Sequence, residues 1–289
     1  MQERVGVRAG AARIGSAIDS LVEPAAAHFL AQRYALYVGS VDSEGRPWAS
    51  QLVGPPGFVT AVGPSIVRID AAPAPGDPLL ANLRADPAIG LLAIDFATRR
   101  RLRVNGTVRS MAGGVVEVVV AQAFGNCPKY IQRREPAAVD ETPPDASRIV
   151  RSRSLSDGQR ARLAAADTFF LATAHPHAGV DVSHRGGRPG FVETPDERTL
   201  VWPDYQGNMM FMSLGNVAID PRAGVLVVDF ERGDVLSLTG AATIDWDPAR
   251  AGRFAGAERV IEMRVDEVVD TSGASPLRWR LLEPSPFNP

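Results

Sequence analysis

The chain has 289 residues, 45% hydrophobic and 22% charged, which suits one large globular domain or two of ordinary size. A formal net charge of -2 gives no basic excess of the kind that nucleic-acid binding requires. The single cysteine excludes an internal disulfide and a cysteine-cluster metal site, and the apolar runs are too short for a signal peptide or a membrane span. We therefore expect a cytoplasmic protein whose partners include neither nucleic acid nor membrane.

The first half of the chain is predicted to contain a helix followed by short strands, which Gly, Pro and Asp separate. The helix covers residues 19–32, and the strands cover residues 34–54 (a strand, a turn and a strand), 65–70, 88–96 and 100–110. The valines of residues 113–126 favour a strand by propensity. However, Val115, Val116, Val119 and Val120 recur at helical spacing, and we predict a helix there.

The second half is predicted to repeat this order after a linker. Residues 133–154 are polar, contain prolines and lack periodicity, which predicts an exposed linker. Ser156 followed by Gln159 is a capping-box pattern and predicts the start of a helix. Strands are then expected at residues 168–187 (a strand, a turn and a strand), 199–204, 223–230 and 234–246.

The two halves also match each other in sequence. GPPGFV (54–59) corresponds to GRPGFV (187–192), and residues 82–106 share nine identities in 25 positions with residues 216–240. Composition alone would give roughly one or two identities, so the chain is an internal duplication. The predicted fold class is mainly β with flanking helices (α+β), as two tandem six-stranded antiparallel barrels. The expected boundaries are 1–132 for the first repeat, with an N-terminal helix and a following helix, 133–155 for the linker and 156–289 for the second repeat.

Four segments resemble a known family: FGNCPKYIQRRE (124–135), DVSHRGGRPGFV (181–192), PDYQGNMMFMSLGN (203–216) and DPRAGVLVVDF (220–230). They are similar to the pyridoxamine 5'-phosphate oxidase-like FMN-binding proteins of the split-barrel fold, in particular to a longer, duplicated branch. The resemblance extends from about Phe29 to Trp246. It implies that FMN is held noncovalently at the edge of a split barrel, at a surface between two barrels. We also expect a homodimer.

The resemblance implies contacts to FMN from two segments of the second copy. On the strand 181–187, the implied contacts are Ser183, His184 and Arg185. The segment 204–216 would hold the phosphate and ribityl chain, through Asp204, Tyr205, Asn208, Ser213 and Asn216.

Physical chemistry gives the segment 204–216 two readings. Gly207 and Gly215 would allow positive φ and close backbone approach to a phosphate, while Phe211 would pack beneath the loop or against the ring. The alternative is that Phe211 and Leu214 form one apolar face of a short helix.

Two further segments leave alternatives open. His184 would place a donor near N1 and the C2 oxygen of the flavin, where negative charge builds up on reduction; alternatively it is a surface histidine satisfied by water. The segment YIQRRE (130–135) either reaches over a neighbouring ring or is a helix C-terminus whose cations complement the dipole.

The first copy has lost the loop that the second copy carries. Three prolines interrupt its equivalent segment, residues 71–83, and remove backbone N–H groups, while only Asn82 still matches Asn216. We therefore expect one FMN per chain, bound mainly by the second copy. Trp48, Tyr130 and Gln132 of the first copy are the candidates for covering its ring.

The expected function is that of an FMN-dependent oxidoreductase, which would transfer hydride or electrons between NADH or NADPH and a small acceptor. The alternatives are a non-enzymatic flavin-binding or storage protein, and a split barrel that holds another planar cofactor such as a deazaflavin or haem. The chain lacks the C-terminal Arg-X-His motif and the phosphate-binding Arg and Lys spacing of the family's founding enzyme. The sequence therefore does not predict oxidation of vitamin B6.

Overall fold

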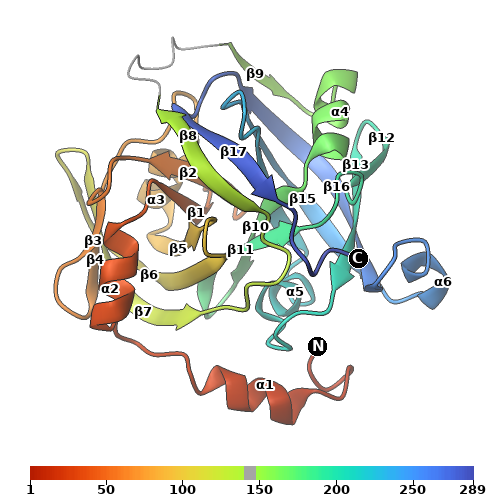
Figure 1. The fold of residues 1–289 in the computed structure, drawn as a ribbon, viewed down its shortest axis with the longest axis horizontal. Coiled ribbons are helices and arrows are strands. Elements are labelled where there is room, and N and C mark those ends of the chain that lie inside the picture. Colours follow the sequence, from red (N-terminus) through yellow and green to blue (C-terminus); the bar gives the residue numbers. More distant parts are fainter. Residues whose placement is uncertain (140–147) are drawn as a thin grey trace.

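Two barrels with the same strand order make up most of the computed structural model, which describes residues 1–139 and 148–289 (Figure 1). The first barrel contains β1 (Ala35–Val41), β2 (Pro47–Val53), β3 (Val59–Ala61), β4 (Ile66–Asp70), β5 (Ala88–Asp95), β6 (Arg100–Ala112) and β7 (Val115–Gly125). The second contains β10 (Thr168–His175), β11 (Gly179–Gly186), β12 (Glu193–Asp196), β13 (Thr199–Tyr205), β14 (Arg222–Val228), β15 (Val235–Asp245) and β16 (Ala257–Thr271).

The sheet orders confirm the predicted duplication and fold class. They are β2-β1-β5-β6-β7-β4-β3 and β11-β10-β14-β15-β16-β13-β12, with all pairs antiparallel. Each order contains the five strands predicted for its repeat, one strand that was not predicted (β7 or β16) and one short edge strand (β3 or β12). In the second sheet, β9 (Ile149–Ser152) also pairs with β16. A bulge also recurs, at Gly106 in β6 and at Gly240 in β15, where a Cβ atom would collide with a carbonyl oxygen of the neighbouring strand.

Short helices flank the barrels: α1 (Arg8–Gly15), α2 (Pro24–Ala31), α3 (Leu79–Ala85), α4 (Asp157–Ala165), α5 (Met212–Val217) and α6 (Pro248–Ala251). The predicted capping box of α4 is confirmed, since the backbone N–H of Gln159 donates to Ser156 Oγ and that of Ser156 donates to Gln159 Oε1. None of the described helices has the length and apolar character needed to cross a membrane.

The helix predicted at residues 113–126 is wrong, because this segment forms strand β7. Val116, Val118 and Val120 point into the barrel core, whereas Val119 is exposed. This alternation has a period of two, which the helical spacing of some valines concealed. The β-branched composition was the better signal, and the first repeat therefore has no helix after β6.

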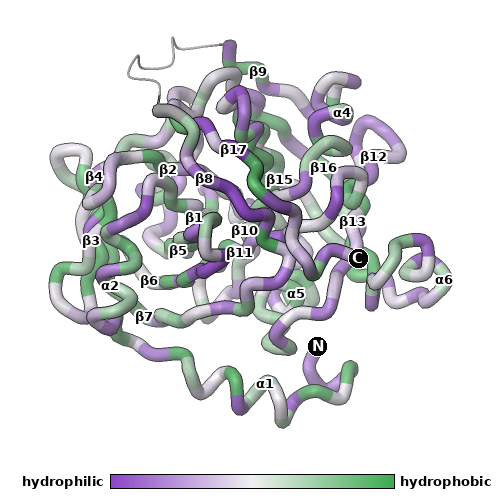
Figure 2. The backbone as a smooth tube through the Cα atoms, viewed as in Figure 1, coloured by the Kyte–Doolittle hydropathy of each residue, from purple (hydrophilic) through white to green (hydrophobic). Residues whose placement is uncertain are grey.

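The predicted linker at residues 133–155 is not irregular throughout. Its first part forms β8 (Arg133–Val139), which pairs with β17 (Leu277–Glu283), and its later part contains β9; residues 140–147 lie outside the described residues. Figure 1 shows the β8–β17 ribbon lying across the strands, and Figure 2 shows its hydrophilic stretch in β8. Trp279 of β17 packs edge-on against Phe96 and Phe230, one from each barrel. The ribbon thus covers the boundary between the barrels.

The barrels meet through equivalent elements. Tyr37 in β1 and Phe170 in β10 occupy equivalent positions and stack on each other with ring centroids 3.5 Å apart. Gly90 in β5 lies against the backbone of β11, and Gly224 in β14 lies against that of β2. Such reciprocal contacts are typical of a two-fold interface, here formed within one chain. A buried apolar cluster fills it, separate from the two barrel cores.

Candidate functional site

The candidate site is a pocket at the boundary between the two barrels. Its lining includes Arg101, Arg103, Asn126, Lys129 and Tyr130 of the first repeat and Ser183–Gly186, Pro203–Tyr205 and Gly207–Leu214 of the second. The enclosed volume is ≈ 120 Å³. Because sites that bury whole small ligands enclose roughly 300–1,000 Å³, a nucleotide-sized ligand would also occupy the open rim.

One wall is the loop between β13 and α5. We expected positive φ at Gly207 and Gly215, but it occurs instead at Met209 (φ 63°) and Phe211 (φ 55°). Gly215 belongs to α5, which corresponds to the alternative short-helix reading, with Leu214 buried in the core. Two non-glycine residues in the left-handed region store strain, a feature common at binding sites.

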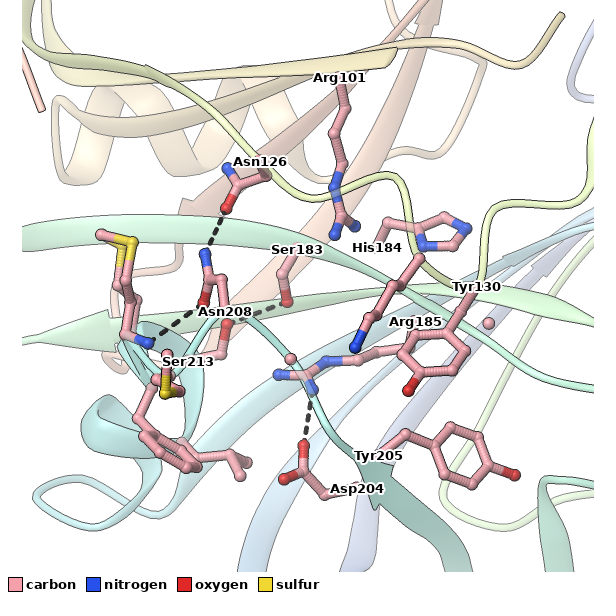
Figure 3. A pocket seen from close by; sticks show the side chains of 18 of the residues that line it. Arg101, Asn126, Tyr130, Ser183, His184, Arg185, Asp204, Tyr205, Asn208 and Ser213 are labelled. Carbon is pink, nitrogen blue, oxygen red and sulfur yellow. Dashed lines mark hydrogen bonds and ion pairs between the residues drawn. The ribbon is translucent and has the colours of Figure 1, made fainter. Parts of the chain in front are cut away.

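The side chain of Asn208 connects the loop to the first barrel. Its Nδ2 donates to Asn126 Oδ1 at 3.0 Å, and its Oδ1 accepts from the backbone N–H of Met210 at 3.2 Å. The Nδ2 of Asn126 is buried and has no hydrogen-bond partner among the described residues. This amide leaves a donor available to a ligand between the barrels (Figure 3).

A buried ion pair connects the barrels below the loop. Arg103 Nη1 lies 2.8 Å from Asp181 Oδ1, and both side chains are almost fully buried. Ser213 Oγ bonds to Asp181 Oδ2 at 3.2 Å and to Ser183 Oγ at 2.9 Å. Ser183 and Ser213 therefore belong to a network that fixes α5 against β11 at the base of the pocket.

A second buried cluster holds the end of β13. Arg185 Nη1 donates to Asp204 Oδ1 at 2.9 Å, and Arg259 Nη1 lies 3.2 Å from the other oxygen, Oδ2. Burial raises the pKa of Asp204, and the two arginines oppose this effect. The carboxylate thus holds the Arg185 guanidinium in place at the pocket. Arg259 also lies over the ring of Phe211, 4.9 Å from its centroid.

Arg101 is a pocket cation that our sequence analysis missed. It has no ion pair or side-chain hydrogen bond among the described residues, and its Nε is buried. Burial, with repulsion from Arg103 and Arg185, lowers its pKa to about 9, so the guanidinium stays charged at neutral pH. The signal lay in the run RRRLR (99–103): in a strand, its positions 101 and 103 share one face.

The His184 side chain points in a different direction from those of Ser183 and Arg185. Successive side chains alternate along β11, and the His184 ring turns away from Ser183 and Arg185 toward the barrel interface (Figure 3), edge-on to Phe170 at 6.0 Å. Burial, reinforced by Arg101, Arg134 and Arg185, lowers the pKa of His184 well below its ordinary value. The imidazole is therefore neutral at physiological pH and is not a cation facing the pocket.

Tyr130 and Tyr205 form the aromatic rim of the pocket. Their ring centroids lie 5.2 Å apart, and Tyr130 OH donates to the backbone oxygen of Gln206 at 3.0 Å. Tyr130 has a positive φ of 67°, and both of these contacts join its side chain to the second repeat. Among the alternatives for the segment YIQRRE, this geometry corresponds to the one in which it reaches over the site.

Trp48 and Gln132, which we expected to cover the flavin ring, do not line the pocket. Trp48 is buried, and its Nε1 donates to Asp42 Oδ2 at 3.0 Å. Gln132 Nε2 donates to the Gly187 oxygen at 3.0 Å, while its Oε1 accepts from the Ser285 N–H at 2.7 Å. These contacts connect the C-terminal segment to the second barrel, so Gln132 has a structural task.

Asn216 also lies outside the pocket. Its Nδ2 donates to Thr173 Oγ1 at 3.0 Å, and Asn82 makes the equivalent bond to Ser40 Oγ at 3.0 Å in the first repeat. The asparagine shared by the two repeats thus ties a short helix to the first strand of its barrel. Its survival in the first copy reflects this structural task, which both barrels need.

The family comparison agrees with the two-barrel architecture. The family model "Pyridoxamine 5'-phosphate oxidase" matches residues 22–148 and matches again over residues 155–276. Together the two matches cover most of the chain, one for each barrel. The protein therefore belongs to the pyridoxamine 5'-phosphate oxidase family. No curated protein matches it significantly.

Solved structures with a similar fold come from several bacteria. HupZ of group A Streptococcus is 13% identical, with a TM-score of 0.34, over 42% of this chain and 98% of that chain. A FAD-binding protein of Mesorhizobium loti is 13% identical, with a TM-score of 0.29, over 42% of this chain and 98% of its own. A protein of Clostridium acetobutylicum related to general stress protein 26 is 9% identical, with a TM-score of 0.30, over 40% of this chain and 87% of its own.

Proposed function

We propose that the chain is a flavoprotein that binds one FMN in the pocket between its barrels. The observation that carries the proposal is the concentration of donors there without partners among the described residues: Arg101 Nε, Arg103 Nε, Asn126 Nδ2 and Arg185 Nε. Donors that are buried without partners cost free energy, which an anionic ligand with many acceptors would recover. FMN has such acceptors in its phosphate, its ribityl chain and the pyrimidine side of its ring.

The chain's own residues would divide the work of binding. Asn126 and Asn208 would donate to the phosphate or ribityl oxygens, because they lie at the loop end of the pocket. Tyr130 and Tyr205 would supply aromatic surface at the rim, where the planar ring would be partly exposed. Arg185, fixed by Asp204, would add a charge-assisted contact.

The proposed reaction transfers hydride or electrons between NADH or NADPH and a small acceptor. The flavin supplies the redox chemistry when bound, whereas the protein binds it, orients it and shapes its electrostatic surroundings. The partly open pocket supports this proposal over simple storage, because an acceptor needs access to the ring.

An absorption spectrum and a flavin titration test binding. We expect the purified protein to be yellow or to bind added FMN, with FMN preferred over riboflavin because the pocket is cationic. Equal affinity for the two flavins would contradict binding of the FMN phosphate by this pocket. The absorption spectrum of a deazaflavin or of haem would show that the cofactor is not FMN.

Turnover tests the reaction. NADH or NADPH should reduce the bound flavin, and an acceptor should then reoxidise it. Reduction by neither nucleotide would favour the storage alternative. Pyridoxamine 5'-phosphate should not be oxidised at a useful rate, and ready formation of pyridoxal phosphate would contradict that expectation.

A further inference from the structure

Arg101 stands apart from the other cations that line the pocket. Arg103 is paired with Asp181, and Arg185 is paired with Asp204. Lys129 Nζ donates to Gln206 Oε1 at 3.2 Å. Arg101 alone among these lining cations has no such partner in the described residues, although its Nε is buried and two other guanidinium groups lie nearby. A charge in this setting is costly unless an anion joins it.

The direction of its side chain distinguishes Arg101 from Asn126, although the two are neighbours across β6 and β7, where the Asn126 N–H donates to the Arg101 oxygen at 3.4 Å. Arg103 lies near α5, since its Nη1 approaches Met212 Sδ at 3.7 Å. Arg101 lies two residues before Arg103 on β6, so both side chains project from the same face of the strand, about 7 Å apart. There it neighbours Arg185 and His184, and it points into the space between Ser183 and Arg185 (Figure 3). The Arg101 guanidinium therefore faces the Ser183–Arg185 side of the pocket, whereas the Asn126 amide faces Asn208.

Because His184 is neutral, another group must supply a positive charge near the flavin ring. Hydride uptake brings two electrons and one proton to a flavin, so the ring gains one negative charge unless a second proton follows. The sequence suggested His184 as the group facing that charge, but its ring lies on the other face of β11. Arg101 reaches the pocket from the opposite barrel and carries the positive charge that His184 lacks.

We propose that Arg101 is the cation that stabilises the negative charge of the reduced flavin ring. The inference rests on the proposed FMN site, and it makes Arg101 a determinant of the reduction potential. A fixed cation of this kind favours acceptance of hydride from a nicotinamide nucleotide. It stabilises the reduced state more than the oxidised one, which is the condition for driving the transfer.

The test compares Arg101→Met, which removes the charge, with Arg101→Lys, which keeps it. Arg109→Met is the matched control, because Arg109 lies on the same strand but is exposed and paired with Glu117 outside the pocket. For each protein, the affinities for FMN and riboflavin are measured, and the midpoint potential is then determined by reductive titration with dithionite beside a reference dye. Circular dichroism checks the fold, and Arg101→Gln is a second neutral variant if Arg101→Met does not fold.

We expect the neutral variants to bind oxidised FMN within a few-fold of the unchanged protein. Their affinity for reduced relative to oxidised flavin should fall at least tenfold, which lowers a two-electron potential by about 30 mV. Sulfite adds through its sulfur to the flavin ring and leaves it negatively charged, so its dissociation constant should also rise at least tenfold. Arg101→Lys should keep most of both properties, and Arg109→Met should keep both.

Two results would overturn the inference while leaving the FMN site standing. One is an unchanged potential and unchanged sulfite affinity in the neutral variants. The other is a loss of FMN affinity, with riboflavin affinity retained, which would assign Arg101 to the phosphate. Failure of the unchanged protein to bind FMN would instead overturn the proposed function and this inference with it.

Discussion

Asn208 and Asn216 are the same residue type on the same short segment, but their surroundings separate them. Asn208 bonds across the pocket to Asn126, whereas Asn216 bonds to Thr173 inside its own barrel. A residue's type and its place in a motif were therefore insufficient to assign its task. Only the tertiary structure shows the partner of each amide. These partners indicate that Asn208 is a proposed ligand contact and that Asn216 has a structural role.

Replacing Asn208 by Ala should weaken FMN binding while leaving the fold intact. We expect a loss of about 1–3 kcal/mol in the free energy of binding, the usual cost of removing one hydrogen-bonding partner from a desolvated site. Flavin titration measures the loss, and circular dichroism checks the fold. Asn216→Ala is the comparison, for which we expect lower thermal stability because Thr173 loses its donor. Unfolding of Asn208→Ala would show that this side chain is a structural cap.

Asp77 provides a pH-dependent prediction in the first repeat. Its Oδ1 accepts from Ser50 Oγ at 2.7 Å and from the Leu79 N–H at 2.8 Å, and burial raises its pKa from 3.8 to about 6. Folding thus disfavours the charged form. The contribution of this group to stability is fully present below about pH 4 and is lost as the pH rises through about 6.

Asp77→Asn keeps an oxygen acceptor but removes the charge. We expect this variant to be more stable than the unchanged protein at pH 8 by about 1–3 kcal/mol, with the advantage absent at pH 4. Urea unfolding at the two pH values measures the difference. Lower stability of the variant at pH 8 would mean that the carboxylate is more favourable in the fold than its burial implies.

At the scale of elements, the strands that were predicted correctly are those in which the flanking turn residues and the pattern of apolar residues both indicate a strand. The prediction for β7 was wrong because some of its valines also fit a helical period, and because its exposed face carries Val119 as well as polar residues. The pairing of β7 with β6 and β4 decides the matter, because both its edges find backbone partners there. No local pattern reports those partners.

Two glycines in equivalent strands should be essential for the contact between the barrels. A Cβ atom at Gly90 would lie 2.8 Å from the Val180 oxygen, and one at Gly224 would lie 2.8 Å from Trp48 Cα. Gly90→Ala should therefore cost about 1–3 kcal/mol of stability, since backbone on both sides must move. Thermal or urea unfolding measures this cost.

Gly158→Ala is the matched control for this substitution. A Cβ atom there would meet nothing within 4 Å, and Gly158 lies in helix α4. We expect it to be neutral or to stabilise the protein by about 0.5–1 kcal/mol, because alanine is the better helix former. Equal effects of the two substitutions would argue against close packing of β5 on β11.

On the scale of the whole molecule, the two barrels form a pseudo-symmetric pair inside one chain. Equivalent residues Tyr37 and Phe170 stack at its centre, and the pocket takes its lining from both repeats. One chain therefore contains both walls of the site without a second subunit. The homodimer expected from the sequence stays a prediction, and the site does not require it.

The pair should bind a single FMN. In the first repeat, the segment equivalent to this loop contains Asp77, whose carboxylate bonds to Ser50, and three prolines lie between residues 71 and 83. A carboxylate in that position repels a phosphate, and the prolines lack N–H donors. Calorimetry, or release of flavin on denaturation, should give one FMN per chain. Two per chain would contradict the prediction, as would a flavin bound only by residues 71–83.

The sequence by itself determined the duplication, the barrel class and the segment that lines the pocket. These features are local or repeated: strand periodicity, capping residues and matched motifs can be read from neighbours in the chain. Tertiary structure alone decided that Arg101 meets Arg185, that the His184 ring turns toward Phe170 at the barrel interface, and that Gln132 and Asn216 serve the fold. The physical reason is that charge pairing and burial depend on residues distant in sequence, which come together only when the second barrel closes on the first.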